Sequence, residues 1–417
     1  MAAVRRLSQS PTDPLANKRM SQSFTIEVAP VIVADDPDNA QSWVEEWRHT
    51  LARDLIQSSR IVEVRANDTV EEASELLLSH NVQCLAVRAA EPTPDAPYMG
   101  LFDYADVNAF LTLAATRPAL LRDEDNPRID AIFAAARSGR VPVSLVSNLS
   151  EKNPLESLPH SATILSLLEV FSRGAHRVLI RSPDSTSFLG FVSDTRLLTW
   201  FGEYAPAAIY LETPLSHLHL PSLHLFSMVV TATSSSTVLD AMRLMSEQGV
   251  SSVAVLEDES GVLLSAVSVT DIGRVVVPSQ DNQILSRPLQ QFVALIKAPH
   301  GSTDGVDPYP VYAVSPQSLL SYTIQKLLAT NAHRLFITRD TSGSTSPLIT
   351  SSRLAGNLTG IVSVVDILSI FARMAHIDVD PARMQRHRRT SSSASSGSRS
   401  SSRSGTGVGL NRTPSLR

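Results

Sequence analysis

The segment SLLSYTIQKLLATNAHRLFIT, residues 318–338, predicts a helix followed by a strand. After a loop rich in Ser, Gly and Pro, the segment GIVSVVDILSIFARM, residues 360–374, predicts a second strand and a closing helix. A unit with this order of elements cannot bury its apolar face alone, so partners of the same shape are expected elsewhere in the chain. The first helix carries its apolar residues at three- and four-residue spacing: Leu320, Ile324, Leu327 and Leu328.

Three earlier stretches repeat this pattern. In every copy an amphipathic helix ends at a residue type that tolerates the left-handed conformation, and an apolar residue starts a strand four positions later. The helix ends are Asn81, Gly174, Gly249 and Asn331. The strand starts are Leu85, Val178, Val253 and Leu335. The sequence therefore predicts an α+β protein built from four copies of one supersecondary unit.

The four repeats are expected to form two pairs, the first with the second and the third with the fourth. A helix over 42–52, with Trp47 on its apolar face, is expected to pack on the first repeat. Segments rich in Ser, Pro, Gly or Arg at both ends lack apolar periodicity and are predicted to be disordered. The expected repeats are 50–115, 141–205, 214–277 and 308–376, and the expected disordered segments are 1–39 and 380–417.

Bulk composition narrows the class of protein. The chain has 417 residues, 43% of them hydrophobic, which is enough for two or more domains. The single cysteine, Cys84, excludes an intrachain disulfide and is expected to be a buried thiol in a reducing compartment. No run approaches the roughly 18 apolar residues of a membrane span, and no secretory signal is evident. A soluble intracellular protein is expected.

Charge is distributed unevenly along the chain. The formal net charge is -5, but the tail after residue 380 carries eight arginines and no acidic residue after position 383, so the body is acidic. Two interpretations of the tail stay open: a solvated disordered segment, or a functional tail that is either a phosphorylation platform or a weak anion-binding segment. The candidate phosphorylation sites follow basic pairs or precede a proline: Ser8, Thr390, Ser391 and Thr413.

Four units of this shape resemble cystathionine-β-synthase (CBS) domains, which associate two by two into Bateman modules. The resemblance covers residues 47–374. The twin segments AHRV (175–178) and AHRL (332–335) are similar to the γ subunit of AMP-activated protein kinase, whose His-Arg pairs in repeats two and four help to hold nucleotide phosphates. The residues at the ribose position also follow the order of the γ subunit: Asp106, Arg196, Asp271 and Asp366.

A closer resemblance is to the fungal four-CBS proteins of the Sds type. It is carried by the segments 102–110, 146–154 and 267–271. It implies a regulatory protein of cytoplasm and nucleus that acts in cell separation and DNA replication, with modulation of a type 2A-like phosphatase.

The resemblance implies AMP, ADP or ATP as ligand. Such a nucleotide needs an apolar slot for the base, a carboxylate for the ribose, and positive charge with backbone donors for phosphate. The implied nucleotide-binding residues are Ser268, Asp271, Ser363, Asp366, His176, Arg177, His333, Arg334 and Asp106. Each has a structural alternative, because Ser-x-x-Asp is also the capping box of a helix start, and a histidine at a strand start can cap carbonyls.

Three positions depart from the γ subunit. Gln83 stands in place of an arginine, Thr195 in place of a lysine, and Asp103 in place of a hydroxyl residue. Each lost charge-assisted phosphate contact costs about 1.5–3 kcal/mol, so a hundredfold weaker nucleotide affinity is expected.

An enzyme is not expected, and neither a catalytic residue nor a metal site is predicted. The sequence has no nucleophile elbow, no Walker loop and no Cys/His cluster, and His217, His219 and His224 lack acidic or thiolate neighbours. Three functions stay open: a regulatory protein that binds phosphatase or kinase subunits, an adenine-nucleotide sensor of the γ type, and a purely structural scaffold. Binding to nucleic acid or membrane is not expected, and a homodimer is left open.

Overall fold

The computed structural model describes most of the chain between Pro37 and Asp378. The described residues are 37–56, 61–94, 96–120, 126–184, 187–204, 208–218, 220, 229–279, 282–297, 313–339 and 357–378. Both predicted disordered tails lie outside these ranges, apart from residues 37–39, which begin a helix. The candidate phosphorylation sites Ser8, Thr390, Ser391 and Thr413 also lie outside them. Within these ranges no helix is both long and apolar enough to cross a bilayer.

Four three-stranded sheets make up the framework, one in each repeat. In every sheet a short first strand pairs in parallel with the middle strand, and the last strand pairs antiparallel with it. The strands are β1 (Glu63–Arg65), β2 (Cys84–Arg88), β3 (Tyr98–Asp103), β4 (Ser157–Leu158), β5 (Arg177–Arg181), β6 (Phe188–Ser193), β7 (Thr231–Thr233), β8 (Ser252–Leu256), β9 (Leu263–Ser268), β10 (Ala313–Val314), β11 (Arg334–Arg339) and β12 (Asn357–Ser363).

Two main helices accompany each sheet, one before the middle strand and one after the last strand. They are α2 (Val70–Ser79) and α3 (Tyr104–Leu120), α6 (Ile164–Ser172) and α7 (Asp194–Glu203), α9 (Val238–Glu247) and α10 (Val269–Ser279), and α12 (Leu320–Ala329) and α13 (Val364–Met374). The predicted α+β class with four CBS repeats is therefore confirmed.

Local sequence accounts for the helix ends. Asn81, Gly174, Gly249 and Asn331 all have positive φ angles, between 48° and 99°, as expected for residues that terminate a helix in the left-handed conformation. Thr69 and Thr237 begin α2 and α9 with complete capping boxes, in which hydroxyl and carboxylate satisfy the first amides.

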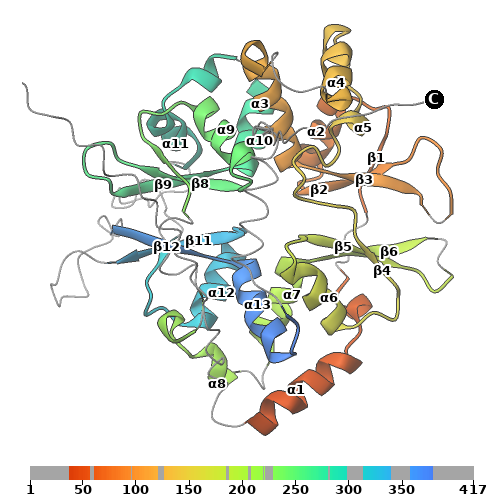
Figure 1. Cartoon of the computed structure of the whole chain (residues 1–417), viewed down its shortest axis with the longest axis vertical. Coiled ribbons are helices and arrows are strands. Elements are labelled where there is room, and N and C mark those ends of the chain that lie inside the picture. Colours follow the sequence, from red (N-terminus) through yellow and green to blue (C-terminus); the bar gives the residue numbers. More distant parts are fainter. Residues whose placement is uncertain are drawn as a thin grey trace, which may run out of the picture.

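The sheets of consecutive repeats face each other (Figure 1). On one side, Cys84, Ala86 and Leu101 of the first repeat form an apolar cluster against Phe191 of the second. On the other side, Ala254 and Leu263 of the third repeat form an apolar cluster with Phe336 and Leu358 of the fourth. The other buried members of this cluster are Val229, Ala266 and Ile361. This face-to-face pairing gives the two Bateman modules that were predicted.

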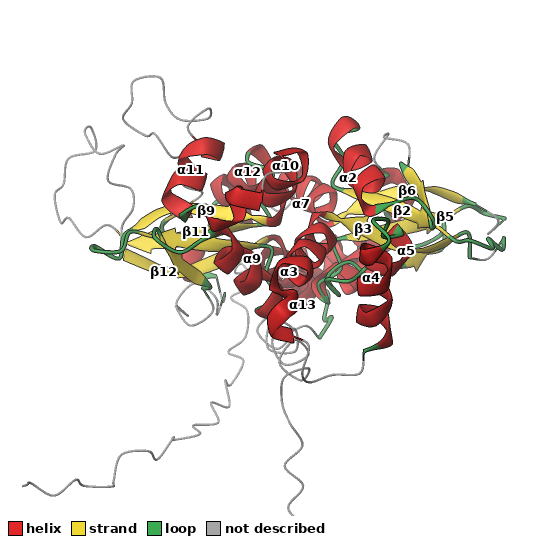
Figure 2. Ribbon diagram, turned by 90° about the horizontal axis from the view of Figure 1, so that it is seen from above, coloured by secondary structure: helices red, strands yellow, loops and turns green. Residues whose placement is uncertain are grey.

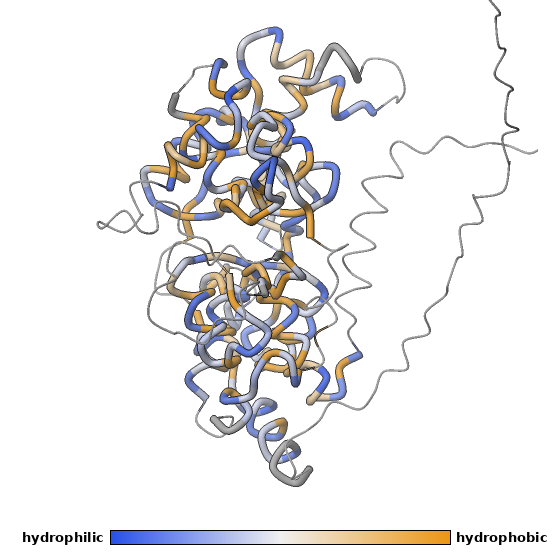
Figure 3. The backbone as a smooth tube through the Cα atoms, turned by 90° about the vertical axis from the view of Figure 1, so that its left-hand side faces the viewer, coloured by the Kyte–Doolittle hydropathy of each residue, from blue (hydrophilic) through white to orange (hydrophobic). Residues whose placement is uncertain are grey.

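The helices pack across the modules instead. Helices α3 and α2 of the first repeat share one buried core with α9 and α10 of the third, and α6 and α7 of the second share another with α12 and α13 of the fourth. Asn108 Nδ2 donates to the Met242 carbonyl at 3.1 Å across the first of these interfaces. Figure 2 shows the helices between the two groups of sheets, and Figure 3 shows that hydrophobic stretches recur in both halves.

The segments that precede the repeats are exchanged within each module. The 3-10 helix η1 (Ala52–Leu55) lies on the second repeat, where the Ala52 amide donates to the Ala162 carbonyl at 2.8 Å, and α5 (Val143–Val146) lies on the first, where the Val143 amide donates to Asp68. In the second module η3 (Leu215–His217) contacts the fourth repeat and α11 (Leu289–Lys297) contacts the third. The remaining helices are α4 (Pro127–Arg137), α8 (Ala208–Leu211) and η6 (Asn282–Ser286).

The expected position of the N-terminal helix was wrong. Helix α1 (Pro37–His49) does not pack on the first repeat: its Trp47 is fully buried against Phe201 of the second repeat and Phe371 of the fourth, with ring centroids 5.1 Å and 6.2 Å away. The reason is the exchange described above, because η1 follows α1 directly and is attached to the second repeat. Although α1 precedes the first repeat in the sequence, it packs on the second and fourth repeats in the structure.

Candidate functional site

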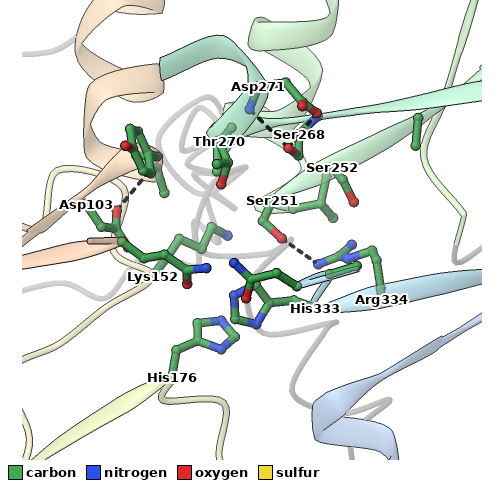
Figure 4. A pocket seen from close by; sticks show the side chains of 18 of the residues that line it. Asp103, Lys152, His176, Ser251, Ser252, Ser268, Thr270, Asp271, His333 and Arg334 are labelled. Atoms are coloured by element: carbon green, nitrogen blue, oxygen red, sulfur yellow. Dashed lines mark hydrogen bonds between the residues drawn. The ribbon is translucent and has the colours of Figure 1, made fainter. Parts of the chain in front are cut away.

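One open pocket of about 230 Å³ lies at the centre, where strand starts and strand-to-helix junctions of all four repeats meet. The first repeat contributes Asp103, the second His176, the third Ser268 and the fourth Arg334 (Figure 4). A ligand in this position would touch both modules at once.

Positive charge dominates the pocket. Five lysine and arginine side chains and two histidines line it, against two carboxylates, which leaves a formal excess of three positive charges with the histidines neutral. The lysines and arginines are Lys152, Arg177, Arg274, Lys297 and Arg334, and the carboxylates are Asp103 and Asp271. An excess of this sign favours an anionic ligand.

The two arginines of the His-Arg pairs are held in the same way. Arg177 Nη2 donates to Gln83 Oε1 at 2.8 Å, and Arg334 Nη2 donates to Ser251 Oγ at 3.3 Å. In both modules the arginine of the even-numbered repeat thus reaches the strand start of the odd-numbered one. These contacts hold the guanidinium groups at the pocket wall, where their fork geometry matches phosphate oxygens.

The third repeat supplies the Ser-x-x-Asp motif of the pocket. Ser268 and Asp271 form the reciprocal bonds of a helix cap at the start of α10, with the Ser268 amide and hydroxyl 2.9 Å and 2.7 Å from Asp271 Oδ2. Lys297 Nζ, from the end of α11, lies 3.2 Å from Asp271 Oδ1. The carboxylate therefore faces the pocket but is already neutralised by a buried ammonium group.

The equivalent motif of the fourth repeat lies outside the pocket. Ser363 and Asp366 form a complete capping box at the start of α13, and Asp366 is 3% exposed and does not line the pocket. Ser363 and Asp366 therefore cannot contact a nucleotide bound in this pocket as it stands, because the Asp366 carboxylate is hydrogen-bonded to the start of α13.

Asp106 is also separate from the pocket. It is fully buried at the start of α3, where its carboxylate accepts the amides of Asn148 at 3.1 Å and Ser150 at 2.9 Å. Asn148 has a positive φ of 52°, so the carboxylate fixes a tight turn that follows α5. The residue that the resemblance places at a ribose ties the turn at 148–150 to the start of α3.

The two predicted histidines lie close together, and the structure adds a residue that the sequence interpretation missed. The ring centroids of His176 and His333 are 5.0 Å apart. Asp194, the first residue of α7, is buried behind them, and its Oδ2 is 2.8 Å from His176 Nδ1 and 3.7 Å from His333 Nδ1. Burial alone would raise the pKa of Asp194, but the charge and hydrogen bond of His176, together with the proximity of His333, outweigh it, and the pKa is lowered.

A sequence signal for Asp194 existed. The amide of the residue at this position donates to the carbonyl of the strand start in three repeats: Asp194 to His176, Val269 to Ser251, and Val364 to His333. The third and fourth repeats thus carry valine where the second carries a carboxylate. A charged residue at a position that is apolar in sister repeats indicates a local role beyond packing.

An apolar wall completes the pocket on the side of the third and fourth repeats. Val250, Ala266, Ile296 and Phe336 line it next to Ser268 and Asp271. Such a wall beside a carboxylate and a group of cations suits a ligand that has one apolar and one anionic part.

Comparisons with known proteins agree with the repeat architecture. The CBS domain family matches residues 227–277. Protein SDS23 of Yarrowia lipolytica is 33% identical over 391 residues, which cover 87% of this chain and 74% of that protein. Protein sds23 of Aspergillus niger is 29% identical over 440 residues, which cover 92% of this chain and 84% of that protein.

Among solved structures, protein MJ1225 from Methanocaldococcus jannaschii, described as a candidate archaeal homologue of γ-AMPK, has a similar fold. Its TM-score is 0.55 at 14% identity, and the match covers 78% of this chain and all of that one. At this level of identity the likeness concerns the fold alone.

Proposed function

The chain belongs to the SDS23 family, and we propose that it is a ligand-controlled regulatory protein whose central pocket binds an adenine nucleotide and thereby sets its affinity for a phosphatase or kinase complex. Its biological setting would be cell separation and DNA replication. The observation that carries this proposal is the convergence of five cationic side chains on one open pocket that residues of all four repeats line.

The phosphates would occupy the basic part of the pocket. Arg177 and Arg334 lie at the wall with their guanidinium groups held by Gln83 and Ser251, so little side-chain entropy is lost when they bind an anion. Lys152 is the further cation on the side of the first module. The base would lie against the apolar wall of Ala266 and Phe336.

The ribose would lie at Asp271, which is the one pocket carboxylate at the start of α10. Its Oδ1 now accepts from Lys297, so the ribose hydroxyls compete with an ammonium group for this oxygen. That competition, together with Gln83 and Thr195 in place of cations, supports an affinity weaker than that of a dedicated energy sensor.

Control of a partner follows from the position of the pocket. A ligand that contacts both modules binds one relative arrangement of the modules better than another, and it can shift their equilibrium by that difference in affinity. The surface offered to a phosphatase or kinase subunit would change with it.

Calorimetric titration of the full chain with AMP, ADP and ATP tests the nucleotide. We expect saturable binding of at least one of them below millimolar concentration. Arg334→Ala should weaken it about 10- to 100-fold, the equivalent of one charge-assisted contact. Arg243→Ala is the matched control, because Arg243 pairs with Asp240 and Glu247 on the exposed face of α9.

The absence of heat at millimolar concentrations of all three nucleotides would reject the ligand part of the proposal. Recovery of phosphatase or kinase subunits on the immobilised chain tests the partner part separately. If recovery is the same with and without nucleotide, and the same for Arg334→Ala, the protein acts as a scaffold rather than as a sensor.

A further inference from the structure

Three metal-ligating side chains gather where the second and fourth repeats meet. They are His176, Asp194 and His333, and one ligand atom of each lies within 4.8 Å of the other two. Two come from the second repeat and one from the fourth, so only the folded chain brings them together. Both histidines line the central pocket (Figure 4), and Asp194 contacts them without lining it.

The backbone fixes all three residues. His176 and His333 directly precede β5 and β11, and their carbonyls accept the amides of Asp194 at 3.1 Å and Val364 at 3.0 Å. Asp194 starts α7, and its Oδ1 accepts the Thr195 amide at 2.7 Å. The ligands are thus carried by strand starts and a helix start, which hold side chains more precisely than loops do.

The polar atoms of the cluster are not fully satisfied. Asp194 Oδ2 is shared by His176 Nδ1 at 2.8 Å and, more distantly, by His333 Nδ1 at 3.7 Å. His333 Nδ1 is buried and has no hydrogen-bond partner among the described residues. Because buried polar atoms are normally paired, this nitrogen calls for a further group at the centre of the cluster.

We propose that His176 Nδ1, His333 Nδ1 and Asp194 Oδ2 bind one divalent transition-metal ion of the zinc class. In a tetrahedral zinc site with bonds of 2.0–2.1 Å, neighbouring ligand atoms are about 3.3 Å apart. The two distances from Asp194 Oδ2, 2.8 Å and 3.7 Å, lie on either side of that value. Each of these two distances would have to change by about half an ångström or less to match the geometry of the ion.

The donor set selects the kind of metal. Two imidazole nitrogens and one carboxylate oxygen suit zinc and its neighbours, whereas magnesium and calcium prefer ligand sets made of oxygen alone. Three protein ligands leave a fourth position open, as in zinc sites that bind a small ligand. That position adjoins the pocket, so water or an anion could complete the coordination.

The charges around the cluster are compatible with a cation. The Asp194 carboxylate supplies the negative charge of the cluster and lies 2.8 Å and 3.7 Å from the Nδ1 atoms of His176 and His333. Arg177 and Arg334, the nearest cations in sequence, are directed to Gln83 and Ser251. A bound ion would tie the second repeat to the fourth, independently of whether the pocket takes a nucleotide.

The test uses the full chain, stripped with a chelator and titrated with zinc chloride against a chromophoric zinc indicator. We expect one equivalent of tightly bound zinc. Asp194→Asn and His333→Gln should each weaken binding at least tenfold. His217→Gln is the matched control, because His217 is exposed at the end of η3 and should leave the equivalent intact.

Two further measurements remove ambiguity. Cobalt chloride should give the intense visible absorption of a tetrahedral ion in the parent chain and lose it in His333→Gln. Circular dichroism checks that the variants fold. If Asp194→Asn does not fold, the result for His333→Gln decides whether the proposal holds. The His333 side chain is a quarter exposed, so its substitution should disturb folding less. No bound equivalent, or one that survives His333→Gln or is abolished by His217→Gln, would overturn the proposal.

Discussion

Two carboxylates at the start of α3, Asp103 and Asp106, both accept hydrogen bonds from backbone amides and so have structural roles. Asp106 is buried and accepts amides from a distant turn, while Asp103 caps the same helix by accepting the Ala105 amide at 2.8 Å and the Asp106 amide at 3.1 Å. Burial and the neighbouring charge of Asp103 raise the pKa of Asp106 to about 8, against the opposing effect of the Ser150 amide.

This raised pKa makes stability depend on pH in a definite direction. Unfolded Asp106 would titrate near 3.9, so between roughly pH 4 and pH 8 the folded chain binds its proton more tightly than the unfolded chain. The contribution to stability is complete below that range. It is lost as the pH rises towards 8.

Asp103→Asn should reduce this loss. The asparagine keeps the acceptor for the helix cap but removes the charge that disfavours ionised Asp106, so the variant should gain about 1 kcal/mol at pH 8 and less at pH 5. Chemical unfolding at both pH values measures the difference. Asp130→Asn, an exposed carboxylate in the first turn of α4, is the control and should change both values equally. Equal effects of Asp103→Asn at the two pH values would contradict the explanation.

The Ser-x-x-Asp motif forms the same helix cap in the third and fourth repeats, but its exposure to the pocket differs between them. Ser268 with Asp271 and Ser363 with Asp366 form the same helix cap, yet only Asp271 reaches the pocket, where Lys297 neutralises it. The cap is a local property of the motif. Access to a ligand depends on burial, because Asp271 lines the pocket whereas Asp366 is only 3% exposed.

Among the helices, the contact between α3 and α10 sets how closely the first and third repeats approach. A Cβ atom added at Gly273 would collide with the ring of Tyr104, which is only 4% exposed and has no space to move into. Another helical glycine, Gly202 of α7, would place a Cβ 3.2 Å from Ile324 of α12, which is merely tight.

Gly273→Ala should therefore destabilise the chain by about 1–3 kcal/mol through overpacking, despite the better helix propensity of alanine. Gly202→Ala is the matched control and should change stability by less than half of that. Thermal or chemical unfolding measures both. Tyr104→Val, which introduces the residue found at the equivalent position of the third and fourth repeats, should remove most of the penalty of Gly273→Ala. A penalty that persists in that background would show that the ring is not its cause.

For the molecule as a whole, the sheets and the helices connect the repeats in different directions. Sheets join consecutive repeats into modules, whereas each helical core joins one repeat of the first module to one of the second. Neither module can bury its helices without the other. The four repeats should therefore behave as one cooperative unit and not as two independent domains.

A fragment of residues 37–211, which holds only the first two repeats, should expose both helical faces and associate with itself or aggregate. Light scattering coupled to size-exclusion chromatography measures its mass. Coexpression with residues 212–378, which include η3, should restore a complex of one copy of each fragment. A stable, fully helical monomer of the first fragment would contradict the interdependence of the modules.

The sequence by itself determined the repeating unit. Helix stripes, strand starts and the residues at the helix ends, such as Asn81 and Asn331, follow from local conformational preferences, and these act over a few residues. The pairing of consecutive repeats and the gathering of His176, Arg177, His333 and Arg334 at one pocket could also be expected from the recurrence of the unit.

Only the tertiary structure decided which repeats share a core, where α1 packs and which carboxylates reach the pocket. Trp47 lies on the second and fourth repeats, Asp194 lies between two histidines, and Lys297 covers Asp271, because exchanged segments and crossing helices bring together residues far apart in the chain. Such contacts depend on how well entire surfaces of helices and sheets pack against one another. A local sequence pattern does not determine that packing, because it covers only residues that are close in the chain.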